Sequence, residues 1–240
     1  MQVKQDFLVR MEDTSPGFRL SNKGMLTMLT NLAALHGNRI GQGPMERERS
    51  GLSWMVVGWR LVVDHRPLLC QTVHGTTWVS LWNRLQTTRD FLLRDEGEQP
   101  FAKATSSWLV LDEHNSHVLR MTPEIVAPYG PEPDEQTFPG YVFPRECPAF
   151  GAMRTVEMQV TRAMIDFNDH VHNVAYMDLF TEALPKDENM DCFSDITLVY
   201  RREIRPGQRI MAVYGRAGEE RVIVLKAGDS DLIHAFLLLR

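Results

Sequence analysis

The sequence has little of what marks several large classes of protein. Only three of its 240 residues are cysteine and no Cys-x-x-Cys pair occurs, so neither a disulfide framework nor a cysteine-based zinc site is expected. It has no glycine-rich phosphate loop and no apolar run long enough to cross a bilayer. The formal net charge of -5 gives no reason to expect nucleic acid or an anionic membrane as partner. These absences predict a protein without cofactor or metal, located in the cytoplasm, with no signal or transit peptide.

Proline, by contrast, is concentrated in one place. Seven of the thirteen prolines lie between residues 121 and 150, together with the acidic run YGPEPDEQ. Proline supplies no backbone donor to a helix or a sheet, so such a segment is typical of a linker. The sequence therefore predicts two domains, 1–122 and 151–240, joined by a linker at 123–150.

The two predicted domains repeat one order of elements. In the first, a short strand precedes a helix at about 21–36, with Ser21 or Asn22 as N-cap and Gly37 just past its end, and four long strands follow. In the second, a strand precedes a helix at about 173–184, and four more strands follow. Short helices and long antiparallel strands predict an α+β fold in which each sheet wraps around one central helix, duplicated and fused.

The most informative segment runs from Asp166 to His170. It places a carboxylate, an amide and an imidazole at alternating positions just before the second helix. Backbone N–H groups at a helix N-terminus can stabilise a developing oxyanion, and polar side chains beside them can position water or polarise a carbonyl. The alternative is that Asp166, Asn168 and Asn173 only cap the helix and shape the turn, as these residue types often do.

A second candidate is a carboxylate in the run Tyr200-Arg-Arg-Glu-Ile-Arg205. Glu203 is predicted in the middle of a strand, where partial burial would let it act as a general base toward water. The alternative is an exposed strand carboxylate that pairs with Arg201 or Arg205, its neighbours on the same face.

Together these segments resemble a known family. The pattern DFNxHV-NV--Y followed by YRRE is similar to the C-terminal half of the acyl-acyl carrier protein thioesterases of plants and bacteria. RDFLLRDEGE (89–98), ATSSWLVLD (104–112) and LRMTPEIV (119–126) resemble the first domain of that family, so the resemblance covers nearly the whole chain. It implies a tandem (double) hotdog fold and the hydrolysis of fatty acyl thioesters of acyl carrier protein to free fatty acid, which terminates fatty acid synthesis.

The resemblance also implies the catalytic residues. The family's proposed set maps onto Asp166, Asn168, His170 and Glu203. Glu203 would activate water, and His170 and Asn168 would orient the water or the thioester. Asp166 would fix the loop. His170 is the competing base, because imidazole titrates near neutral pH.

Several positions depart from the family or from the repeat. His172 stands where the family usually has asparagine, at the first turn of the predicted helix, where it serves as a cap or tunes the site. Ile204 stands where many plant members have a cysteine, so no thiol nucleophile is available there. In the first domain, Ser15, Gly17 and Arg19 align with the three motif positions, so one active site per chain is expected.

The resemblance favours the first domain as the part that binds the acyl chain. The predicted substrate-binding residues are Met25, Met28, Leu29, Trp54, His172 and Asn173. For the apolar ones, the alternative is plain core. Acyl carrier protein is acidic, so docking needs a local basic patch. The predicted docking residues are Arg201, Arg202, Arg205 and Arg209.

Two other functions compete with this prediction. One is an acyl-CoA thioesterase on the same fold. The other is a non-catalytic acyl-binding or regulatory hotdog protein, because a fold does not fix a function. Retention of all four candidate catalytic residues argues against the second. A homodimer is also compatible with the sequence.

Overall fold

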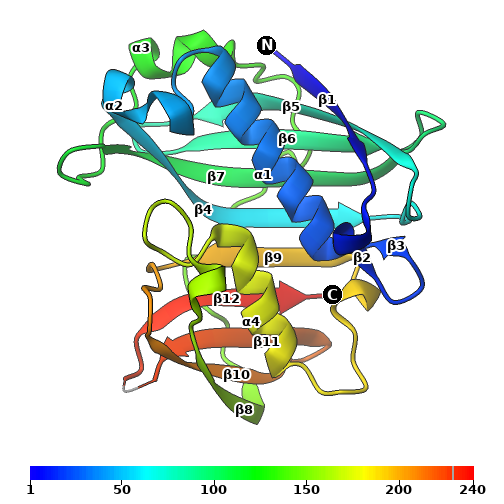
Figure 1. Ribbon diagram of the computed structural model, residues 1–240. Coiled ribbons are helices and arrows are strands. Elements are labelled where there is room, and N and C mark those ends of the chain that lie inside the picture. The colour runs from blue at the N-terminus through cyan, green and yellow to red at the C-terminus, as the bar shows by residue number, and fades with distance from the viewer. Residues whose placement is uncertain (229) are drawn as a thin grey trace. The chain divides into compact units, whose positions relative to one another are not determined.

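The computed structural model describes residues 1–228 and 230–240 (Figure 1). The chain divides after Tyr141 into two units, Met1–Tyr141 (unit 1) and Val142–Arg240 (unit 2). Unit 1 contains β1 (Val3–Leu8), β2 (Thr14–Ser15), β3 (Arg19–Leu20), α1 (Asn22–Arg39), α2 (Arg47–Ser50), β4 (Leu52–Val63), β5 (Thr72–Trp82), β6 (Thr87–Arg94), β7 (Pro100–Asp112) and α3 (Pro123–Val126). Unit 2 contains β8 (Gly151–Gln159), α4 (Tyr176–Ala183), β9 (Asp195–Tyr200), β10 (Arg209–Ala217), β11 (Glu220–Ala227) and β12 (Ile233–Leu239). Short 3-10 helices are η1 (Met11–Asp13), η2 (Pro44–Glu46), η3 (Ala127–Tyr129), η4 (Arg162–Met164), η5 (Asn173–Ala175) and η6 (Met190–Cys192).

Both units arrange their long strands in the same order. In unit 1 the antiparallel neighbours run β1-β5-β6-β7-β4, and in unit 2 they run β8-β10-β11-β12-β9. The first strand of each unit therefore lies beside the third, and the second strand lies at the other end of the row. In each unit a single longer helix packs on the strands: α1 on β1 and β5, and α4 on β8, β10 and β11 (Figure 1). The predicted duplication of strand, helix and four strands is confirmed.

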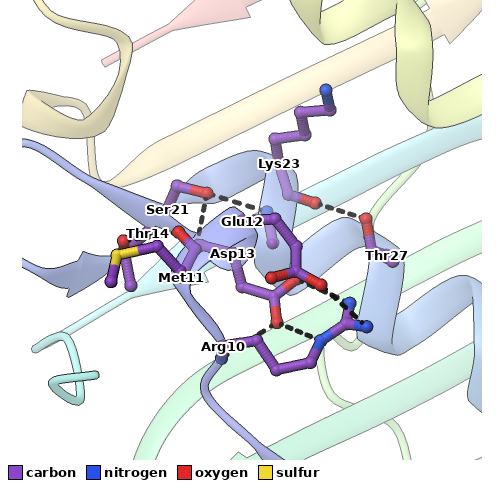
Figure 2. Close-up of polar contacts among 9 residues, drawn as sticks. Arg10, Met11, Glu12, Asp13, Thr14, Ser21, Lys23 and Thr27 are labelled. Atoms are coloured by element: carbon purple, nitrogen blue, oxygen red, sulfur yellow. Dashed lines mark hydrogen bonds and ion pairs between the residues drawn. The ribbon is translucent and has the colours of Figure 1, made fainter. Parts of the chain in front are cut away.

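The N-terminus of α1 is fixed by the loop in front of it (Figure 2). Ser21 Oγ accepts a hydrogen bond from the backbone N–H of Gly24 at 2.9 Å, so Ser21 is the N-cap, one of the two residues the sequence favours. The same hydroxyl donates to the carbonyl of Asp13 at 2.8 Å. Arg10 in turn binds the Asp13 carboxylate, with Nε 3.0 Å from Oδ2. The helix start is thus tied to the preceding turn as well as capped.

The far end of α1 differs from the prediction. Gly37 was predicted just beyond the helix, but the helix continues to Arg39 and Gly37 lies inside it. The reason is packing, because a side chain at Gly37 would come within 3.0 Å of the backbone of Gly43. Glycine here permits the close approach of the following segment rather than the end of the helix. The second predicted helix, 173–184, is realised as η5 followed directly by α4.

A buried polar cluster lies between α1 and the strands of unit 1. Arg89 on β6 donates from Nη1 to His36 Nδ1 at 3.0 Å, and its guanidinium lies 5.3 Å from the ring centre of Tyr129. Burial lowers the pKa of Arg89 to about 10. Burial, followed by the Arg89 charge, lowers the pKa of His36 to about 3, so this imidazole is neutral at neutral pH.

Acid is expected to destabilise the protein through His36. The unfolded chain binds a proton on this imidazole below about pH 6.5, whereas the folded pKa is about 3. The stabilisation is therefore complete above pH 6.5 and is lost as the pH falls toward 3. Relative to His36→Gln, which keeps an acceptor for Arg89, the wild type should lose about 2 kcal/mol of unfolding free energy between pH 6.5 and pH 5. Urea unfolding at the two pH values measures this, and parallel pH dependence of the two proteins would contradict it.

The proline-rich segment predicted as a linker packs against the two units along most of its length. On unit 1, Trp78 Nε1 donates to the carbonyl of Glu135 at 2.6 Å, and Arg60 stacks over the rings of Phe138 and Tyr141, 4.6 Å from each centre. The Asp90 carboxylate accepts hydrogen bonds from Thr137. On unit 2, the partly buried side chains of Phe143, Cys147 and Phe150 pack on the core. The segment 123–150 is therefore divided between the two units and covers part of each.

Candidate active site

The loop before η5 is a tight turn built by Asp166. Its Oδ1 accepts a hydrogen bond from the backbone N–H of Asn168 at 2.8 Å, and its own N–H donates to the carbonyl of His170 at 2.9 Å. Asp169, at the corner, has a φ of 58°, a left-handed conformation that Asp tolerates better than most residues. Asp166 therefore shapes the turn, as one of the two sequence-based interpretations holds. The turn leaves Asn168 exposed and His170 partly exposed.

Glu203 does not lie in a strand, and this prediction is wrong. β9 ends at Tyr200, because the N–H groups of Arg201 and Arg202 both donate to one carbonyl, that of His234, at 2.8 and 3.1 Å. Two donors on one acceptor break the alternation of a ladder, and the chain turns away. The Glu203 side chain is 44% exposed, so the strand burial that would desolvate it is absent.

His170 and Glu203 nevertheless meet. His170 Nε2 lies 2.8 Å from Glu203 Oε2. The other carboxylate oxygen, Oε1, accepts from Arg205, with Nε at 2.8 Å and Nη2 at 2.5 Å. Glu203 thus joins the predicted histidine and also pairs with Arg205, as the alternative interpretation foresaw. The pairing raises the pKa of Arg205, chiefly through the hydrogen bond to Glu203.

Two tyrosines that the sequence analysis did not single out as site residues, the buried Tyr176 and the half-buried Tyr200, tie the helix to the segment that follows β9 and carries Glu203. Tyr200 on β9 donates from its hydroxyl to the carbonyl of Asn173 at 2.7 Å. Tyr176 on α4 donates to the carbonyl of Arg202 at 3.4 Å, and the two rings meet edge to face with centres 5.0 Å apart. Burial raises the pKa of both phenols, so they remain neutral donors.

The predicted substrate-binding residues fall into two groups. Met25, Met28 and Leu29 on α1 are buried in unit 1, and Trp54 on β4 meets the ring of Tyr129 edge to face at 5.5 Å. The other two residues lie in unit 2, at the start of η5. His172 is the residue preceding η5, and its side chain makes no capping hydrogen bond there. In the part of the chain that the structure describes, Oδ1 of Asn173 is buried with no hydrogen-bond partner.

The predicted docking arginines differ in their surroundings. Arg205 binds Glu203, and Arg209 Nη1 lies 3.3 Å from Glu157 Oε1. Arg201 and Arg202 are exposed, and among the described residues neither guanidinium has a carboxylate within 4.0 Å. These two residues, next to Glu203 in the chain, are the ones available to an acidic partner.

The same loop recurs in unit 1 without the side chains of the site. The β2–β3 pairing of Thr14 with Leu20 has its counterpart in the bridge between Ile165 and Val171. Phe18, with a φ of 57°, occupies the place of Asp169. Ser15, Gly17 and Arg19 therefore lie where unit 2 has Asp166, Asn168 and His170, which agrees with the sequence alignment of the repeats.

The position of Glu203 can be matched in the same way. Leu20 N–H donates to the carbonyl of Pro67 at 2.8 Å, as Val171 N–H donates to that of Ile204 at 2.8 Å. Arg66 in unit 1 therefore takes the place of Glu203. It donates to the carbonyl of Leu20 at 3.0 Å and to Asn22 Oδ1 at 2.8 Å, a structural role. A contacting histidine and carboxylate are thus present in one repeat of the two.

Across residues 1–228 and 230–240, no group of three or more His, Cys, Asp or Glu side chains is placed to hold a metal ion. None of the helices in that part of the chain is both long enough and apolar enough to cross a membrane.

Solved structures with the same architecture identify the fold. An acyl-ACP thioesterase from Bacteroides thetaiotaomicron superposes with a TM-score of 0.85 at 17% identity, over 99% of this chain and 96% of that one. The 12:0-ACP thioesterase from Umbellularia californica gives 0.80 at 17% identity, over 100% and 96%. The predicted double hotdog fold is confirmed.

Family models and curated relatives then identify the family. The acyl-ACP thioesterase N-terminal domain matches residues 1–129 and the C-terminal domain matches residues 150–230. The chain belongs to the acyl-ACP thioesterase family. It is 27% identical over 220 residues to the chloroplastic oleoyl-acyl carrier protein thioesterase 2 of Arabidopsis thaliana, covering 83% of this chain and 59% of that protein. It is 24% identical to the chloroplastic palmitoyl-acyl carrier protein thioesterase of the same plant, covering 86% and 51%. The chain thus spans between half and three fifths of the length of these relatives.

Proposed function

We propose that this protein hydrolyses fatty acyl thioesters of acyl carrier protein, releasing a free fatty acid and the carrier with its free thiol. The observation that carries the proposal is the contact between His170 Nε2 and Glu203 Oε2 at 2.8 Å, in a chain of the acyl-ACP thioesterase family. A histidine held by a carboxylate is an arrangement that removes a proton from water near neutral pH.

The contact with Glu203 favours one tautomer of the imidazole for this role. A carboxylate only accepts, so a neutral His170 would carry its proton on Nε2, the nitrogen that faces Glu203. The lone pair of the neutral imidazole is then on Nδ1, which becomes the general base. Glu203 orients the ring and stabilises the imidazolium that forms, and Arg205 holds the carboxylate from its other side. This assignment replaces Glu203 as the base, because both of its oxygens already have partners.

The proposed hydrolysis has two steps, addition of water and loss of the thiolate. Water loses a proton to His170 Nδ1 while its oxygen attacks the thioester carbonyl carbon, giving a tetrahedral intermediate. The C–S bond breaks as the intermediate collapses, and the thiolate receives the proton from the imidazolium. Asn168 is exposed in the same turn as His170, and its amide nitrogen lies 3.4 Å from Asp166 Oδ2. We assign this amide as a donor to the carbonyl oxygen of the thioester, with Asp166 keeping the turn in shape.

The remaining assignments follow the family. We infer that unit 1 receives the acyl chain near Met25, Met28, Leu29 and Trp54, with His172 and Asn173 on the side of the reacting group. The acidic carrier docks on Arg201 and Arg202, which are exposed and lack a carboxylate partner among the residues described. Homodimer formation and a cytoplasmic location stay predictions.

Hydrolysis rates on matched substrates test the function. Acyl carrier protein thioesters and CoA thioesters with the same series of acyl chains are compared by release of free thiol. The proposal expects kcat/KM for the carrier thioester to exceed that for the CoA thioester of the same chain. A preference for CoA would make the protein an acyl-CoA thioesterase, the competing function. Binding of acyl carrier thioesters without turnover would make it a non-catalytic acyl-binding protein.

A further inference from the structure

A buried histidine outside the predicted catalytic set contacts the segment that carries Glu203. His234 lies on β12 and is 2% exposed. Its Nδ1 lies 2.9 Å from the carbonyl oxygen of Glu203. A carbonyl only accepts, so Nδ1 must carry a proton and donate it.

The main chain of His234 holds the same segment. Its carbonyl accepts from the N–H groups of both Arg201 and Arg202, at 2.8 and 3.1 Å. Backbone and side chain of one residue thus bind three consecutive residues, Arg201 to Glu203, at the point where β9 ends and the chain leaves the ladder. The backbone bonds stop the strand, and the imidazole fixes the peptide of Glu203 itself.

This arrangement costs stability, which argues that it serves something other than folding. The other ring nitrogen, Nε2, is buried and has no hydrogen-bond partner among the residues that the structure describes. A buried polar atom without a hydrogen-bond partner destabilises the folded state. Burial lowers the pKa of His234, so the side chain remains a neutral donor at neutral pH.

The repeat in unit 1 provides an internal comparison. There, Asp64 N–H donates to the carbonyl of Phe101 at 2.8 Å, the counterpart of the bond from Arg201 N–H to His234. Phe101 therefore takes the place of His234 and is fully buried. The unit without a catalytic base has an apolar ring at this position, and the unit with one has an imidazole bound to the Glu203 peptide.

We propose that His234 is a positioning residue for hydrolysis: it holds the Glu203 peptide so that the carboxylate stays aligned with His170. This inference rests on the proposed function for its effect on rate, but the hydrogen bond can be tested without any substrate. His234 acts through Glu203 and does not touch the reacting atoms.

The substitution His234→Phe tests the proposal with a side chain that this fold already accepts at the equivalent position. The expected result is a fall in kcat of about 10- to 100-fold with KM nearly unchanged, because a small misalignment of a catalytic group has an effect of this size. The melting temperature should stay the same or rise, because the unpaired Nε2 is removed. His234→Asn keeps a donor where Nδ1 was, so it should recover most of the lost kcat.

Two controls separate positioning from stability and from function. Phe236→Leu, two residues further along β12 and buried on the same side, should lower the melting temperature without lowering kcat. Amide hydrogen exchange at residues 201–205 should quicken in His234→Phe and not in His234→Asn, whatever substrate the protein uses. The proposal would be overturned if His234→Phe left either the exchange rate or kcat unchanged. It would also be overturned if the losses of kcat in His234→Phe and His234→Asn only followed the losses of melting temperature. Quickened exchange in a protein that hydrolyses no thioester would instead overturn the proposed function.

Discussion

Replacing Glu203 by glutamine is expected to lower kcat by about 10²- to 10⁴-fold while KM changes little. Glutamine keeps the size and can keep the contact with His170, but it has no charge to stabilise the imidazolium that forms when His170 takes a proton from water. The protein should remain folded, because the Glu203 side chain is 44% exposed and leaves no cavity when changed. Steady-state rates on the best thioester of the wild type measure the effect.

Chemical rescue separates the two members of the pair. His170→Ala should lose activity to the same degree as Glu203→Gln, and the double variant should be little worse than either, because the two residues act as a unit. Added imidazole should restore part of the activity of His170→Ala, since the site is open to solvent. If instead formate restores Glu203→Ala while imidazole does nothing for His170→Ala, Glu203 is the base. Near-normal kcat in Glu203→Gln would remove Glu203 from the mechanism.

The double charge reversal Arg201→Glu with Arg202→Glu is expected to raise KM for acyl carrier protein thioesters by about 10- to 100-fold, the effect of roughly 1.4 to 2.8 kcal/mol. Both guanidinium groups are exposed and lack a carboxylate partner in the described part of the chain, so their charges are available to an acidic protein. The difference should shrink at high ionic strength, because exposed charges are screened by salt.

The specificity of that effect needs a charge-matched control. Arg84→Glu with Arg120→Glu changes two exposed arginines of unit 1 and alters the formal net charge by the same amount. This control should leave KM for the carrier thioester almost unchanged. A small thioester without a carrier should be hydrolysed equally by all the variants. Equal losses on carrier and small substrates, or equal losses in both double variants, would refute docking at Arg201 and Arg202.

Local chemistry made the helices and the duplication readable from the sequence. Ser21 caps α1 as a serine before an apolar stripe should, and the strands of each unit follow one another along the chain as the apolar runs do. The helix end predicted at Gly37 was wrong because glycine is equally suited to ending a helix and to allowing a neighbouring backbone to approach closely. The choice depends on Gly43, a contact made only once the chain has folded.

In the candidate site, too, the features that depend on contacts between distant parts of the chain could not be predicted from the sequence. Asp166, Asn168 and His170 could be found because they lie within one turn, whose local hydrogen bonds the sequence implies. The surroundings of Glu203 could not, since the end of β9 is set by a carbonyl on β12, more than thirty positions later in the chain. His234 gives only a weak signal, a single imidazole in the apolar run of β12. Its counterpart Phe101 becomes visible only through the matched hydrogen bonds of the two repeats.

The fastening of the proline-rich segment has a practical consequence for anyone who wishes to separate the two units. Proteases such as trypsin cut preferentially where the chain is exposed and loosely held, as it often is between tandem domains. Here the exposed Arg145 lies between Phe143 and Cys147, which pack on the core of unit 2, while the preceding residues are held on unit 1 by Trp78. Native digestion should therefore be slow at Arg145. A recombinant fragment that ends at residue 122 would lack the residues of the proline-rich segment that pack on unit 1, whereas a fragment that ends at residue 141 would keep them.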